Sequence, residues 1–132
     1  MILLSEYFQS KPHTPEHEAA ATDLLARVEN LCTTLAWDYP IDPDTGTSIS
    51  GSKGGAGDGG FRLTTATTGS AKSSHKEAKA VDIYDPANLL DDLITDALLT
   101  AYGLYREHPD DTPGWCHLTT RAPGSGRRTF KP

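Results

Sequence analysis

The sequence predicts a single domain that combines two main helices with several short strands. Its 132 residues and 36% hydrophobic content suit one hydrophobic core over residues 1–132. Two segments begin with helix-start residues and continue with apolar side chains at helical spacing. Three other segments are short, rich in aliphatic, aromatic or threonine residues, and bounded by turn residues, as strands commonly are.

The first helix is expected to begin after Thr14, a favourable N-cap residue, with Pro15 at the first helical position. Apolar residues then recur at spacings of four, three and four: Leu24, Val28, Leu31 and Leu35. This spacing places them along one side of a helix. We expect that side to pack on the core and the helix to end before residues 37–40.

A glycine-rich loop is expected to follow. Residues 41–60 contain seven of the twelve glycines, and loops of this length are usually functional or mobile. Phe61 and Arg62 come next, in a strand predicted over residues 61–65. We therefore expect residues 51–60 to be mobile and to border the functional cleft.

The second helix is expected to start at Asp85 and Pro86 and to stop at Gly103. Its predicted inward face consists of Leu90, Ile94, Ala97 and Ala101. The remaining strands are predicted over residues 80–85 and 115–121.

Composition argues against nucleic acid and membranes as partners. A formal net charge of −6 disfavours a protein that binds nucleic acid by neutralising its phosphates. The first apolar run is too short for a signal peptide or a membrane span. Residues 121–132 hold four basic residues and no acid, so we expect a solvated basic tail. Cys32 and Cys116 are expected to be reduced thiols.

A charged residue interrupts the strand predicted over residues 80–85. Because side chains alternate between the two faces of a strand, Asp82 points away from Val81 and Ile83. His117 is a similar polar residue within the last predicted strand. If the two strands are neighbours, both polar side chains project from the same face of the sheet.

His75 lies in the loop before the first of these strands and can close over Asp82 and His117. Two imidazoles and one carboxylate form a ligand set typical of catalytic Zn²⁺. The fourth coordination position is then left to a water whose pKa falls to about 7. We therefore predict a zinc site formed by His75, Asp82 and His117.

Each of these residues has a simpler interpretation when it is considered alone. Asp82 would be a carboxylate at a strand end that accepts backbone hydrogen bonds. His75 would be an exposed loop histidine, and His117 a hydrogen-bonded core histidine. The three residues taken together favour the metal site.

Three segments resemble the zinc D,D-peptidases: FR at 61–62, SSHKEAKAVDI at 73–83 and GWCHL at 114–118. These enzymes, of the hedgehog-like metallopeptidase superfamily, are carboxypeptidases or endopeptidases that cleave D-alanyl-D-alanine or cross-links in bacterial peptidoglycan. The similarity is greatest to the small peptidases of phages and prophages. It implies an α+β fold in which a small antiparallel β-sheet, flanked by two main helices, carries the zinc.

The resemblance also assigns roles to single residues. It implies His75, Asp82 and His117 as the metal ligands. It further implies that Arg62 holds the substrate carbonyl or carboxylate, where a guanidinium would stabilise an oxyanion.

One position departs from the pattern of that family. Well-characterised members place a general-base Glu three residues before the second histidine ligand, and that position is Gly114 here. The nearest carboxylates upstream are Glu107, Asp110 and Asp111. We take Glu107 as the candidate catalytic base; the alternative is an exposed acid that pairs with Arg106 or with the basic tail.

The resemblance implies a zinc-dependent peptidase that cleaves peptide bonds next to D-amino acids in peptidoglycan stem peptides. The alternative, which Gly114 favours, is a non-enzymatic phage virion or tail module, structural or wall-binding, that contacts other virion proteins and retains a degenerate zinc site. Either protein would be made in the bacterial cytoplasm without a signal peptide. It would reach the cell wall during lysis or as a component of the phage particle.

Overall fold

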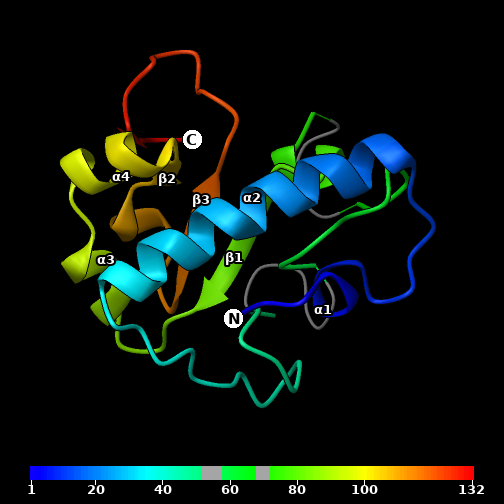
Figure 1. The fold of residues 1–132 in the computed structure, drawn as a ribbon, viewed down its shortest axis with the longest axis horizontal. Coiled ribbons are helices and arrows are strands. Elements are labelled where there is room, and N and C mark those ends of the chain that lie inside the picture. The colour runs from blue at the N-terminus through cyan, green and yellow to red at the C-terminus, as the bar shows by residue number, and fades with distance from the viewer. Residues whose placement is uncertain (52–57, 68–71) are drawn as a thin grey trace.

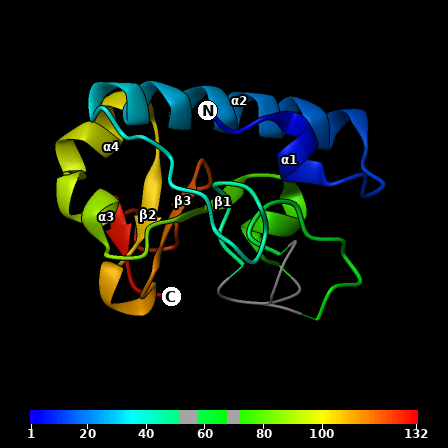
Figure 2. The same cartoon turned by 90° about the horizontal axis from the view of Figure 1, so that it is seen from below.

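One long helix, α2, lies across a four-stranded sheet (Figure 1), and the view from below shows it on one side of that sheet (Figure 2). The computed structural model describes residues 1–51, 58–67 and 72–132. Its α-helices are α1 (Leu4–Phe8), α2 (Pro15–Thr34), α3 (Leu89–Leu93) and α4 (Asp96–Tyr102), and its 3-10 helices are η1 (Ser74–Glu77) and η2 (Pro109–Asp111). Its strands are β1 (Ala80–Tyr84), β2 (Tyr105–Glu107), β3 (Trp115–Thr119) and β4 (Thr129–Phe130). The expected α+β class is confirmed.

Helix α2 begins and packs as its sequence predicts. The Thr14 hydroxyl accepts a hydrogen bond from the His17 backbone N–H at 3.1 Å, which satisfies one of the unpaired amides of the first turn. Leu24, Val28 and Leu31 are buried in the core. The spacing of apolar residues therefore identified the buried side of this helix correctly.

The second helical region is divided into α3 and α4. Ile94 has an extended backbone, with φ −77° and ψ 132°, and the Thr95 side chain then caps α4 by accepting the Leu98 backbone N–H. Because the helix breaks at Ile94, the side chains of α4 no longer continue the inward face of α3. The prediction of Ala97 and Ala101 on the inward face is therefore wrong. Both are exposed. The stop at Gly103 is confirmed, since this residue adopts the left-handed conformation at the end of α4.

The sheet is mixed, with the strand order β1-β3-β2-β4. Strand β3 is antiparallel to both β1 and β2, as expected, but β4 runs parallel to β2, so a purely antiparallel sheet is the wrong prediction. Strand β4 belongs to the segment that we expected to be a solvated tail. It returns to the sheet because the edge of β2 offers unpaired backbone groups: the His108 N–H donates to the Phe130 carbonyl at 2.7 Å.

Residues 61–65 do not form the predicted strand. The Phe61 N–H donates to the carbonyl of Tyr7, whereas the Arg62 N–H donates to the carbonyl of His75. Because consecutive residues bond to two different segments, no ladder with a single partner strand forms. The Phe61 side chain is nevertheless buried in the core.

The core lies between α2 and one face of the sheet. The side chains that β1 and β3 direct toward it are Val81, Ile83, Cys116 and Leu118. The thiols of Cys32 and Cys116 are both buried and free, as expected. No helix in the described residues combines the length and the apolar character needed to cross a bilayer.

We predict that Leu24→Ala lowers the free energy of unfolding by about 2–5 kcal/mol, because it leaves a cavity beneath a residue with no exposed surface. Leu93→Ala is the matched control, since Leu93 is 48% exposed and should cost less than about 1 kcal/mol. Urea unfolding followed by circular dichroism measures both changes. Equal losses in the two variants would contradict the placement of Leu24 in the core.

Candidate metal centre

The pairing of β1 with β3 places Asp82 directly opposite His117. The backbone groups of Asp82 bond away from β3: its N–H donates to the Gly59 carbonyl and its carbonyl accepts the Ser50 N–H, both at 2.8 Å. Asp82 and His117 are therefore a non-hydrogen-bonded pair, the kind in which facing side chains lie closest. The His117 Nδ1 atom lies 2.8 Å from Asp82 Oδ1.

His75 reaches the same carboxylate from η1. Ser73 caps this short helix by accepting the His75 backbone N–H, and the left-handed Ala78 ends it. The His75 ring is buried, and its Nε2 atom lies 3.3 Å from Asp82 Oδ1. The loop histidine is therefore not exposed, and the sequence-predicted triad is brought together.

A backbone carbonyl orients the His75 ring. The His75 Nδ1 atom lies 2.9 Å from the Gly60 carbonyl oxygen, which can only accept a hydrogen bond, so Nδ1 carries the hydrogen. In the neutral ring the lone pair is then on Nε2, which faces the Asp82 carboxylate. Either a proton on Nε2 or a metal ion between the two groups would relieve the repulsion of these facing lone pairs. This arrangement fits a metal ligand set, in which the other ring nitrogen of a histidine usually donates to a carbonyl or carboxylate.

The ligand atoms of His75, Asp82 and His117 all lie within 4.8 Å of one another. Within the described part of the chain, this is the one group of three or more His, Cys, Asp or Glu side chains arranged closely enough to hold a metal ion. The group can therefore hold a metal.

Burial and charge set the protonation states in this cluster. Burial by itself would raise the pKa of Asp82, but His75 and His117 hold it well below its usual range, so the carboxylate is ionised. Burial lowers the pKa of His75, against the opposing effect of the Asp82 charge. A carboxylate anion and a neutral imidazole are the forms that bind metals.

Arg62 holds the other oxygen of Asp82. Its Nη2 atom lies 3.5 Å from Asp82 Oδ2, and its Nε–H donates to the Asp58 carbonyl at 2.6 Å. A guanidinium that holds substrate must reach the pocket surface, but Arg62 is only 4% exposed. The two oxygens of Asp82 are thus divided, with Oδ1 toward the histidines and Oδ2 toward the arginine.

A pocket of about 410 Å³ opens over the cluster, and Arg62 and Glu107 both line it. In the β2–β3 register Arg106 lies opposite Leu118, and continuing it by one residue brings Glu107 opposite His117. Asp82, His117 and Glu107 therefore form a row across three neighbouring strands.

The other carboxylates named as possible bases lie elsewhere. Asp110 and Asp111 do not line the pocket; Asp111 pairs with Lys131 at 3.3 Å. Gly114 is not a pocket residue either. Sequence reasoning missed the Phe130 wall of the pocket, because the segment that contains it was interpreted as a solvated tail.

Two glycines allow the loop before Arg62 to pass close to the backbones of Ser50 and Tyr7. A Cβ atom on Gly59 would lie 2.0 Å from the Ser50 carbonyl oxygen, and one on Gly60 would lie 2.5 Å from that of Tyr7. The Gly60 carbonyl holds His75 and the Asp58 carbonyl accepts the Arg62 Nε–H, so the described end of the glycine-rich loop borders the candidate metal centre, as expected. The mobility that we predicted for residues 51–60 concerns mainly residues 52–57, which lie outside the described residues.

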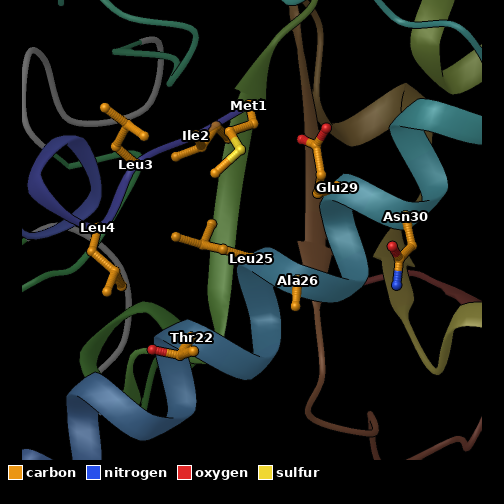
Figure 3. A pocket seen from close by; sticks show the side chains of 9 residues that line it. All are labelled: Met1, Ile2, Leu3, Leu4, Thr22, Leu25, Ala26, Glu29 and Asn30. Carbon is orange, nitrogen blue, oxygen red and sulfur yellow. The ribbon is translucent and has the colours of Figure 1, made fainter.

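A second pocket, of about 490 Å³, lies between the N-terminal segment and α2 (Figure 3). Figure 3 shows mainly apolar side chains, among them Ile2, Leu4 and Leu25. Glu29 is the single carboxylate among the residues that line this second pocket, and no histidine or cysteine lines it. The polar pocket over Asp82 is therefore the candidate functional site.

No protein-family model, no curated protein and no solved structure matches this chain.

We predict that the purified protein binds about one metal ion, and that His75→Ala and His117→Ala each abolish this binding, because each removes one of three ligands. His13→Ala should bind as the wild type does, since His13 is exposed and lies outside the cluster. Elemental analysis after gel filtration measures the content. Undiminished metal in both ligand variants would disprove the assignment.

We predict that Gly60→Ala weakens metal affinity by about 10- to 100-fold, the usual effect of disturbing a group that orients a ligand. The new methyl group would force the Gly60 backbone away from Tyr7 and shift the carbonyl that holds His75. Gly124→Ala is the control, because a Cβ there meets nothing within 4 Å. Competition with a chromogenic chelator gives the affinities; identical values for Gly60→Ala and wild type would refute this role.

Proposed function

We propose that the protein is a zinc-dependent peptidase that cleaves peptide bonds next to D-amino acids in bacterial peptidoglycan. One observation supports it most: three candidate ligands, a guanidinium and a carboxylate line a single pocket. The resemblance to zinc D,D-peptidases in the segments around Arg62, Asp82 and His117 supplies the substrate class.

The donor set favours zinc among the common metals. Two imidazoles and one carboxylate suit Zn²⁺, whereas Mg²⁺ and Ca²⁺ prefer oxygen ligands throughout. Three protein ligands are typical of catalytic sites, and four are typical of structural ones. A bound zinc ion would supply Lewis acidity and would lower the pKa of a coordinated water toward about 7.

The side chains of the pocket provide the remaining functions. Glu107 faces the same pocket as the ligands and would accept the proton of the attacking water. Arg62 would keep Asp82 ionised and oriented through the contact at 3.5 Å, and it would polarise the substrate carbonyl from the pocket wall.

The second candidate is a non-enzymatic phage virion or tail module with a degenerate zinc site. Two observations favour it: Gly114 stands at the position of the usual family base, and the Arg62 side chain already contacts Asp82 and Asp58. Such a module would contact other virion proteins. The enzyme would reach the wall during lysis or as a component of the particle.

We predict slow, chelator-sensitive release of amino groups from purified cell walls. Glu107→Gln should lower the rate by about 10²- to 10⁴-fold without loss of zinc, because the amide cannot accept a proton and Glu107 is not a ligand. Asp110→Asn is the matched control, since Asp110 is exposed and lies outside the pocket.

Two outcomes would change the proposal. If the wild type releases no amino groups on walls of several cross-link types, the virion module becomes the better account. If Glu107→Gln is as active as the wild type, the enzyme stands but another group is the base.

A further inference from the structure

The pocket over the metal centre is more basic than the protein as a whole. Arg62, Lys72 and Arg121 line it together with only two acids, Asp82 and Glu107, although the whole chain has a net charge of −6. Arg62 and Asp82 face one another, so their charges largely cancel. A divalent ion in the cluster would add further positive charge. Glu77 pairs with Arg121 in the same way, so a divalent ion in the cluster is what would give the pocket a net positive charge and attract an anionic ligand.

A hydrogen bond joins the Arg121 side chain to the Lys72 backbone beside this pocket. The Arg121 Nη1 atom donates to the Lys72 carbonyl at 2.6 Å and to Glu77 Oε1 at 2.5 Å. These bonds connect the end of β3 to the segment that leads into η1. The Lys72 and Arg121 side chains both line the pocket that also contains His75.

Both cations retain binding capacity. A guanidinium has five N–H donors. Among the described residues, only the Nη1 atom of the Arg121 guanidinium donates hydrogen bonds, to Lys72 and Glu77. The Lys72 ammonium is exposed and forms no ion pair or hydrogen bond with the part of the chain that the structure describes. A planar fork of donors next to a point charge suits a carboxylate.

We propose that Lys72 and Arg121 form a carboxylate-binding subsite of the pocket, next to the metal centre. The inference builds on the proposed function in one respect, namely that the carboxylate belongs to the peptide substrate. The subsite would hold the peptide in one orientation over the cluster. It would also make the protein prefer peptides with a free carboxylate to peptides in which that group is amidated.

A stem pentapeptide, L-Ala-γ-D-Glu-L-Lys-D-Ala-D-Ala, tests the subsite because it has two free carboxylates. Two analogues each replace one of them with a carboxamide, at the D-Glu residue or at the C-terminus. Calorimetric titration into zinc-loaded Glu107→Gln protein measures the binding of all three intact peptides. The same titrations are made with Lys72→Ala and Arg121→Ala added together, with Arg121→Lys added, and with Arg127→Ala added as an exposed control outside the pocket.

We expect one of the two amidated peptides to bind about tenfold more weakly than the parent peptide, the scale of one hydrogen bond to a charged group. The Lys72→Ala and Arg121→Ala substitutions together should abolish this difference. Arg121→Lys should retain part of it, and Arg127→Ala all of it. Unchanged zinc content in every variant would show that the metal centre is intact.

The proposal is overturned if the three peptides bind equally, if none binds, or if the difference survives loss of both cations. Cleavage of the parent peptide by the wild type is assayed separately. Selective binding without cleavage would refute the proposed peptidase and retain the subsite. Cleavage of the parent peptide together with equal binding of the three peptides would support the peptidase and refute the subsite.

Discussion

The direct pairing of Asp82 with His117 across β1 and β3 is the constraint on which the site depends. A slip of one residue in this register would turn Asp82 into the core and bring Val81 or Ile83 to the pocket face. Packing against α2 opposes the slip, because Val81, Ile83 and Leu118 fill the core on the opposite face. The hydrophobic core thus sets the geometry of a polar centre with which it shares a sheet.

Burial of the Asp82 carboxylate is costly unless every part of its charge is matched. Its partners come from three separate segments: His117 from β3, His75 from η1, and Arg62 from the loop that follows the described end of the glycine-rich segment. Gly60 extends the network, since its carbonyl holds His75 while its backbone packs against Tyr7 near the end of α1. The ligands are therefore held in place by the fold before any ion binds.

The position of α2 on one side of the sheet leaves the other side available for chemistry. On that open face Asp82, His117 and Glu107 lie in one row, and the returning C-terminal segment contributes Phe130 to the wall. The Phe130 and His117 rings lie edge to face, with centroids 6.3 Å apart. The arrangement combines a candidate metal site, a carboxylate and the cationic side chains of Lys72 and Arg121 in a pocket of about 410 Å³, a size within the range of small-molecule sites.

Local patterns in the sequence were sufficient to predict the start of α2, its buried side, and the alternation that sets Asp82 and His117 apart from the core. These features depend on neighbours a few residues apart, which side-chain periodicity and capping preferences determine. Only the tertiary structure decided that residues 61–65 bond to two segments, that Ile94 divides the second helix, and that the basic tail returns as β4. It also decided that Glu107, and not Asp110 or Asp111, lines the pocket. Each of these outcomes depends on which distant segment supplies the hydrogen-bond or packing partner, and a local pattern does not contain that information.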